Sequence, residues 1–230
     1  MDNRFYISNI TNNKAEFTGQ EANHIAKVRR CKVGDEIVAF NGDGLDYFLR
    51  ITSILKDTVE ADILRTEENK SGGGNTTVYL AMLKNDAMVT AIDHLAEMNV
   101  KHVKLFKSDF SVADFDNKKL EKLRNVCIQA SKQCERADIM QVSIIKADEV
   151  ATDIMQFKNR FFAYEDSTTK IEKFCGDFAV IIGPEGGFSK SEVEKFSKVA
   201  KNVSLGNTIL RAEVACVAAI AELKVVQYEG

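Results

Sequence analysis

The stretch most informative about chemistry is a glycine-rich turn directly after an apolar run. Residues 179–182 are apolar and lead into Gly183-Pro184-Glu185-Gly186-Gly187-Phe188, which holds the only proline of the chain. Proline fixes one backbone angle and glycines free the others, so a strand followed by a tight turn is expected. Ligands of open parallel sheets bind just beyond the carboxyl ends of strands. The turn is therefore a candidate ligand-binding loop; a strand-to-helix connection without a ligand is the alternative.

The residues after this turn predict a helix that starts at Ser189. Glu192 stands three residues further on and completes a capping box, and Phe188 with Val193 can form the accompanying hydrophobic staple. No Gly-Lys-Ser/Thr follows the turn, and Gly-x-Gly-x-x-Gly is absent. These absences exclude the phosphate loop and the dinucleotide-binding fingerprint.

A second segment, 203–213, repeats the pattern of a short strand that ends at a glycine. A helix is expected from about Leu210 to Val226, which places Arg211 and Glu213 in its first turn. A cation at that position opposes the helix dipole, so Arg211 is a candidate functional residue. The alternative is that Arg211 only braces the turn by pairing with a carboxylate such as Glu185 or Glu213.

Two patterns of secondary structure lie on either side of a polar, glycine-rich linker at residues 71–76. Residues 1–70 contain short strand patterns between turn residues, including 36–40 and 47–51, and one helix over 20–30. A small, mostly antiparallel β-barrel is expected there. Residues 77–230 alternate strands with helices, which predicts an α/β domain with a mainly parallel sheet. Its expected strands are 78–83, 100–106, 141–145, 160–164 and 178–182, and its expected helices include one capped by Asp86 and one over 117–134.

Composition excludes several classes of protein. The net charge of −3 argues against a protein that coats nucleic acid through bulk electrostatics, although local basic clusters such as 27–32 remain. Five cysteines and three histidines show no zinc-binding spacing, so no metal site is expected. No apolar run has membrane-spanning length and the start has no apolar signal core, which predicts a cytoplasmic protein with reduced thiols.

The motifs resemble those of the ribosomal RNA small subunit methyltransferase E family, a member of the SPOUT superfamily. The strongest similarity lies in the two C-terminal segments, 183–192 and 205–213. Weaker similarities in the N-terminal and middle parts involve His24, Val28-Arg29-Arg30, Val33-Gly34-Asp35, Lys84, Met88, Glu97, Gln133 and Arg136.

This resemblance implies a fold, a reaction and a set of site residues. The fold would be a PUA-like β-barrel followed by a SPOUT α/β domain with a trefoil knot, assembled as a homodimer. The reaction would be methylation of uridine N3 in 16S rRNA by S-adenosylmethionine, with small-subunit rRNA or the assembled small ribosomal subunit as partner. The cofactor-binding residues would be Tyr164, Glu165, Gly183, Glu185, Gly186, Leu205, Gly206, Ile209 and Leu210.

Arg211 is our candidate for stabilising the uridine anion during that reaction, and Glu185 is the candidate general base. Arg29, Arg30 and Arg136 are candidates for phosphate contacts that position the RNA, with surface salt bridging as the alternative.

The chain departs from the family pattern at several positions. Val214 stands where threonine is common, His94 where lysine is usual, Asn99 where glycine is usual, and Gln129 and Lys132 where acids are usual; no counterpart of a common arginine is found around 108–110. Alternatives therefore stay open: a methyltransferase acting on another RNA, or an RNA-binding protein without turnover. A nucleotide-dependent enzyme of ordinary doubly wound type is a third, disfavoured by the missing phosphate motifs.

Overall fold

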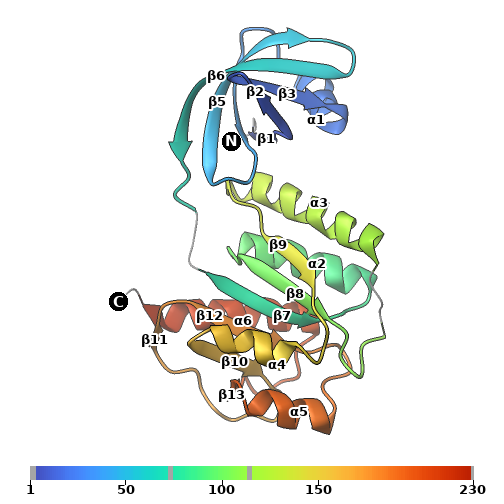
Figure 1. The fold of residues 1–230 in the computed structure, drawn as a ribbon, viewed down its shortest axis with the longest axis vertical. Coiled ribbons are helices and arrows are strands. Elements are labelled where there is room, and N and C mark those ends of the chain that lie inside the picture. The colour runs from blue at the N-terminus through green and yellow to red at the C-terminus, as the bar shows by residue number, and fades with distance from the viewer. Residues whose placement is uncertain (1–3, 72–74, 113–115, 229–230) are drawn as a thin grey trace. The chain divides into compact units, whose positions relative to one another are not determined.

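The computed structural model describes residues 4–71, 75–112 and 116–228 (Figure 1). The chain forms two compact units: Met1–Gly72 with Ser131–Ile139, and Gly73–Ala130 with Met140–Gly230. Of the linker expected at 71–76, residues 72–74 lie outside the described residues, and Thr76 already begins strand β7. The segment Ser131–Ile139 groups with the first unit, although the sequence pattern assigned it to the second domain.

The first unit is a six-stranded sheet in the order β1-β4-β5-β6-β3-β2. Only the β1–β4 pair is parallel, so the predicted small and mostly antiparallel β domain is confirmed. The predicted helix over 20–30 is a short α-helix continued by a π-helix. The elements are β1 (Arg4–Tyr6), β2 (Asn9–Thr11), β3 (Lys14–Thr18), α1 (Gly19–Asn23), η1 (His24–Val28), β4 (Glu36–Phe40), β5 (Leu45–Ile54) and β6 (Thr58–Glu68).

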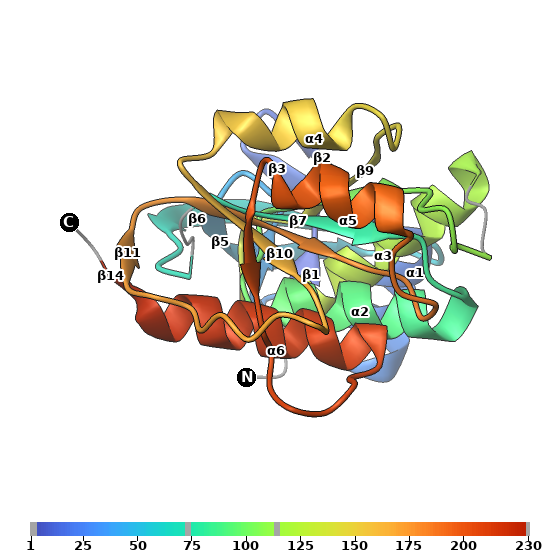
Figure 2. The same cartoon turned by 90° about the horizontal axis from the view of Figure 1, so that it is seen from below.

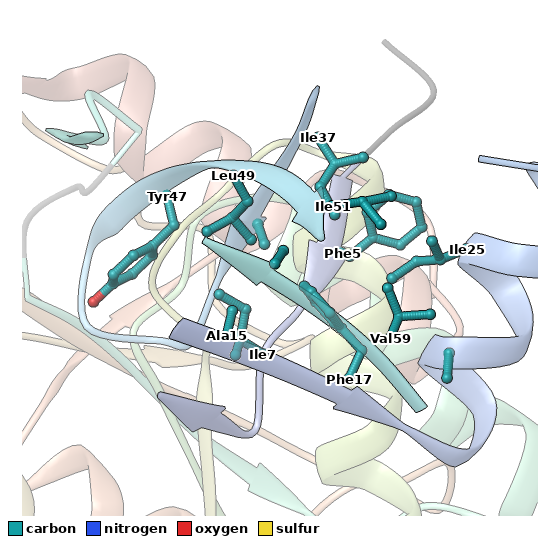
Figure 3. Packing of buried hydrophobic residues seen from close by; sticks show 13 residues of the cluster. Phe5, Ile7, Ala15, Phe17, Ile25, Ile37, Tyr47, Leu49, Ile51 and Val59 are labelled. Carbon is teal, nitrogen blue, oxygen red and sulfur yellow. The ribbon is translucent and has the colours of Figure 1, made fainter. Parts of the chain in front are cut away.

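The sheet of the first unit encloses one apolar core (Figure 3). Strands bury alternate residues, as β3 does with Ala15 and Phe17, because successive side chains point to opposite faces. The rings of Phe5 and Phe17 meet edge to face, with centroids 6.3 Å apart. Ile25 of η1 is fully buried in the same core, which fixes the helical segment against the sheet.

Segment 131–139 joins the first unit through buried polar contacts. The Arg136 side chain is 2% exposed and donates from Nε and one terminal nitrogen to the two carboxylate oxygens of Asp138, at 3.1 and 2.9 Å. Arg4 donates to the Arg136 carbonyl at 2.8 Å. Lys132 binds both carboxylate oxygens of Glu21, so a lysine at this position has an acidic partner. Paired and hydrogen-bonded charges of this kind tolerate burial.

The second unit is built on a parallel six-stranded sheet in the order β13-β10-β12-β7-β8-β9, as the sequence predicted. Its central strands are buried along their whole length, which is typical of a sheet covered on both faces. The strands are β7 (Thr76–Ala81), β8 (His102–Phe106), β9 (Gln141–Ile144), β10 (Asn159–Ala163), β12 (Phe178–Ile182) and β13 (Lys201–Val203), with a separate parallel pair of β11 (Phe174–Cys175) and β14 (Gln227–Tyr228).

Helices cover both faces of this sheet (Figure 2). On one face α4 and α5 cover a cluster that includes Tyr79, Phe162 and Phe196. On the other, α2 and α6 pack against each other and α6 contacts β12. The helical elements are α2 (Asn85–Glu97), α3 (Asn117–Gln133), α4 (Val150–Asp153), η2 (Ile154–Gln156), α5 (Lys190–Ser197) and α6 (Ala212–Val226). No helix within the described residues is long and apolar enough to span a membrane.

The start of α2 differs from the sequence prediction, and the conformation of Asn99 explains one departure from the family pattern. The N-cap of α2 is Lys84, and Asp86 lies in its first turn, so the predicted capping by Asp86 is wrong. The acid there still favours the helix dipole. Asn99 has a φ of +57°, a left-handed conformation that asparagine tolerates better than most residues. This explains how asparagine occupies a position where the resemblance expects glycine.

Candidate functional site

Three loops meet at one edge of the parallel sheet. Strand β10 pairs in parallel with β12 on one side and with β13 on the other. Their carboxyl ends, at Ala163, Ile182 and Val203, therefore lie at the same edge, where ligands of open parallel sheets bind. The loops that follow these strands enclose a cavity of about 1100 Å³.

The cavity collects the residues expected to bind a cofactor. Its lining includes all nine of them: Tyr164, Glu165, Gly183, Glu185, Gly186, Leu205, Gly206, Ile209 and Leu210. The walls combine glycine backbone with apolar side chains, and Ile209 is 92% exposed. An apolar side chain that exposed has no packing role in the free chain. The cavity thus offers backbone polar groups and apolar surface together, which is the usual make-up of a small-molecule site.

Close packing and backbone conformation explain two glycines of the first loop. A Cβ at Gly183 would lie 2.6 Å from the Phe188 ring, which itself packs edge to face on Phe162 and Phe196. Gly187 has a φ of +71°, and its N–H donates to the Pro184 carbonyl at 3.0 Å to close the turn. A side chain at either position would displace the turn, because neither a clash nor a positive φ is easily relieved here.

A buried carboxylate anchors this turn to the neighbouring loop. Glu192, 8% exposed, forms the predicted capping box with Ser189 at the start of α5. Its two oxygens also accept from the Ser108 hydroxyl and the Asp109 N–H, each at 3.1 Å. The Ser189 hydroxyl in turn donates to Asp109. One acidic side chain therefore joins the start of α5 to the loop after β8.

The other two loops are tied to each other. The Tyr164 N–H donates to the Val203 carbonyl and the Ser204 N–H to the Thr169 carbonyl, at 3.1 and 3.0 Å. The Tyr164 hydroxyl donates to Asp166, and this hydrogen bond raises the pKa of Tyr164.

The two candidate catalytic residues stand at different places around the cavity. One oxygen of Glu185, which lines the cavity, accepts from the Lys84 N–H at 3.1 Å. Arg211 is the N-cap of α6, one residue before the helix rather than inside its first turn. It is exposed, and its guanidinium has no hydrogen bond or ion pair with any residue that the structure describes. The alternative pairing of Arg211 with Glu185 or Glu213 is therefore absent among these residues.

The three candidate phosphate-binding arginines separate into two kinds. Arg29 and Arg30 are exposed at the end of η1, together with Lys27 and Lys32. Arg136 is buried and held by Asp138. Its guanidinium is committed inside the first unit, which argues against a phosphate contact.

Part of the cavity wall is formed by residues that no sequence pattern identified as site residues. Ala221, Glu222, Val225 and Val226, from the last turns of α6, line it. These residues lie in a helix whose composition is that of an ordinary buried helix, so only the fold brings them to the site. Among the described residues no group of three or more His, Cys, Asp or Glu side chains could hold a metal ion.

Fold and site together define a class: a parallel α/β protein with a small-molecule cavity at the carboxyl edge of its sheet, joined to a small β domain. Comparison with known families makes this specific. A family model described as an RNA methyltransferase domain matches residues 70–224, and one described as an RNA methyltransferase PUA domain matches residues 17–64. The chain belongs to the RNA methyltransferase domain family.

Relatives with the same name occur in several bacteria. Ribosomal RNA small subunit methyltransferase E of Rickettsia conorii is 29% identical over 96% of this chain and 95% of its own length. The protein of that name from Bacillus subtilis is 27% identical over 90% of this chain and 88% of its own length.

Solved structures support the fold. A Legionella pneumophila protein in complex with the cofactor SAM superposes with a TM-score of 0.90 at 23% identity, covering 99% of this chain and 98% of that one. Ribosomal RNA small subunit methyltransferase E from Neisseria gonorrhoeae, bound to S-adenosyl methionine, superposes with a TM-score of 0.85 at 22% identity over the same shares of the two chains.

The role of Glu192 leads to a prediction about stability. Replacing Glu192 by Ala leaves the Ser108 hydroxyl and two backbone N–H groups without their acceptor. We expect the free energy of unfolding of the second unit to fall by roughly 2–4 kcal/mol, because hydrogen-bond donors that are buried or partly buried are costly when they lose their acceptor. Urea denaturation followed by circular dichroism measures this. Glu192→Gln, which keeps one acceptor oxygen, should lose less; equal losses for the two variants would contradict the anchoring role.

Proposed function

We propose that the chain is an S-adenosylmethionine-dependent methyltransferase that modifies RNA of the small ribosomal subunit. The observation that carries the proposal is the cavity at the carboxyl ends of β10, β12 and β13, which gathers all nine residues expected to hold the cofactor. Membership of the RNA methyltransferase family supports the reaction, and the named relatives support the substrate class.

The residues present fit this cofactor. A cavity of about 1100 Å³ is slightly larger than the usual range of small-molecule pockets, roughly 300–1000 Å³, so the whole cofactor has room. Leu205, Ile209 and Leu210 offer apolar surface for an adenine ring. The backbone of the glycine turn, beginning at Gly183, offers hydrogen-bonding groups at close approach, since its glycines carry no side chain.

The chemistry required of the protein is modest. S-adenosylmethionine, when bound, supplies a methyl group on a positively charged sulfur that is already activated for transfer. The protein then mainly aligns the accepting atom, and it must also help that atom to lose its proton. For uridine the accepting atom is N3, which would lose its proton and gain a bond to the methyl carbon as the bond from that carbon to sulfur breaks, leaving a neutral thioether. The negative charge that forms when the proton leaves spreads over the two adjacent carbonyls.

We assign the stabilisation of that charge to Arg211. Its guanidinium is exposed and unpaired within the described residues, and the residues on either side of it, Leu210 and Ala212, line the cavity. A cation close to developing negative charge lowers a barrier substantially. We assign the acceptance of the N3 proton to Glu185, which lines the same cavity and has one oxygen held by the Lys84 N–H.

The finer parts of the proposal rest on the resemblance of the motifs. They are uridine N3 of 16S rRNA as the target atom, a homodimer as the working unit, and a trefoil knot in the C-terminal part. A paired uridine has N3 engaged in the base pair, so the target base must be unpaired or flipped out. We propose that Arg29 and Arg30 of the first unit contact RNA phosphates and position the substrate.

The direct test is transfer of a labelled methyl group from S-adenosylmethionine to small ribosomal subunits that lack the native modification, followed by nucleoside analysis. The proposal predicts labelled N3-methyluridine in 16S rRNA. A different labelled nucleoside would keep the enzyme class and correct the target. Binding of RNA without any labelled product would instead favour an RNA-binding protein without turnover.

Substitution of Arg211 tests its assigned role. We expect Arg211→Ala to lower kcat by about 100-fold, the typical size of losing one charge-stabilising group. Cofactor affinity, measured by calorimetry, should change little, because the group acts on the RNA base. Stability should also be preserved, since the side chain is exposed and unpaired within the described residues.

Arg211→Lys provides the matched comparison, because it keeps the positive charge without the planar guanidinium. It should retain more turnover than the alanine variant. Full turnover of Arg211→Ala with intact cofactor binding would remove the assignment.

The basic cluster of the first unit leads to a prediction about salt dependence. An Arg29→Ala/Arg30→Ala double variant should bind RNA less tightly than the wild type at low salt. A plot of log affinity against log salt concentration should also be less steep, by about 1–2 in total, because each lost phosphate contact removes one unit or slightly less. Filter binding at several salt concentrations measures this. Lys14→Ala serves as control, since Lys14 is an exposed cation at the opposite end of β3 from α1. A slope unchanged from the wild type would contradict the phosphate contacts.

A further inference from the structure

One aromatic side chain near the cavity is conspicuously exposed. Phe110, in the loop after β8, is 51% exposed, and its ring meets no other aromatic ring in the described parts of the chain. Leaving half of a phenylalanine in water forgoes part of the roughly 1.5–3 kcal/mol that its full burial contributes. The ring is therefore poorly explained by the stability of the fold.

The loop that carries Phe110 is nevertheless firmly held. Ser108 is 2% exposed and donates to Glu192, and the Asp109 N–H donates to the other oxygen of that carboxylate. The Asp109 carboxylate accepts from the Ser189 hydroxyl. The Ser111 N–H donates to the Ser108 carbonyl at 3.0 Å and closes the turn around Phe110. The backbone on both sides of the ring is thus fixed, and an exposed ring on a fixed backbone is pre-organised for contact.

The position of the ring relates it to the proposed reaction. The Cβ of Phe110 lies 3.2 Å from the point where a Cβ of Gly186 would stand. Gly186 lines the cavity, whereas Phe110 itself is outside the lining. Phe110 therefore packs against the glycine turn without lining the cavity, and its half-exposed ring lies beside the loop that forms the cavity wall.

We propose that the exposed ring of Phe110 stacks on an unpaired base of the RNA substrate beside the glycine turn of the cavity. Every nucleobase has a flat face that stacks on aromatic rings, and an unpaired base must find a new stacking partner once it leaves its neighbours. The inference rests on the proposed function, because it takes RNA as the substrate. It adds a base-binding residue to the cofactor-binding and charge-stabilising ones.

The absence of tryptophan from the chain allows a direct test. Phe110→Trp introduces the single tryptophan of the chain, which can be excited selectively over the tyrosines, and an RNA fragment with an unpaired target uridine should quench its emission on binding. Val112→Trp is the control, since Val112 lies two residues away and is 79% exposed. Its emission should change much less. Equal quenching of the two variants would overturn the stacking contact.

Steady-state kinetics of Phe110 variants provide a second, independent test. Phe110→Leu should lower kcat/KM for RNA by roughly 10- to 100-fold, the effect of losing one base–aromatic stack, while Phe110→Tyr stays close to the wild type. Affinity for S-adenosylmethionine should be unchanged in both. Unchanged kcat/KM of Phe110→Leu would overturn the proposal, and so would a loss confined to cofactor affinity, which would assign the ring to the cofactor's adenine. Absence of methyl transfer by the wild type would be the separate failure of the proposed function.

Discussion

The candidate site depends above all on the buried carboxylate of Glu192. It completes the capping box at the start of α5, and it also accepts from Ser108 and Asp109 in the loop that follows β8. A carboxylate that is 8% exposed is tolerated because all these donors converge on it. The glycine turn lies between β12 and α5, so fixing the start of α5 also fixes where the turn ends. Without this anchor, the flexible glycines would leave the cavity wall poorly defined.

The sheet supplies the second constraint, since strand order decides which loops meet. Because β10 lies between β12 and β13 and all three are parallel, loops distant in sequence open at one edge. The β8 loop enters the same region through the Glu192 contacts and brings Phe110 against Gly186. The cavity, the cation proposed to stabilise charge (Arg211) and the ring proposed to stack on a base (Phe110) are thereby separate parts of the second unit. Each of the proposed roles can then be tested by its own substitution.

Sequence patterns predicted the parts of this arrangement that depend on local signals. Strands β4 and β12 were bounded correctly because apolar runs end at turn residues, and the capping box needed only the spacing of Ser189 and Glu192. Contacts between distant segments leave no periodic pattern. The hydrogen bond from Arg4 to the Arg136 carbonyl inside the first unit, and the approach of Phe110 to Gly186, were therefore not predictable from spacing. The short elements α4, β11 and β14 are also too brief to give a pattern.

The central claim is that the cavity beyond β10, β12 and β13 holds S-adenosylmethionine. A crystal structure of the protein grown with this cofactor tests it most directly. The account predicts cofactor density inside the cavity, in contact with the glycine turn at Gly186 and with Leu205 and Ile209, and with the methyl carbon open towards Arg211. Density at another place on the chain, or an empty cavity at saturating cofactor with binding confirmed by calorimetry, would contradict it.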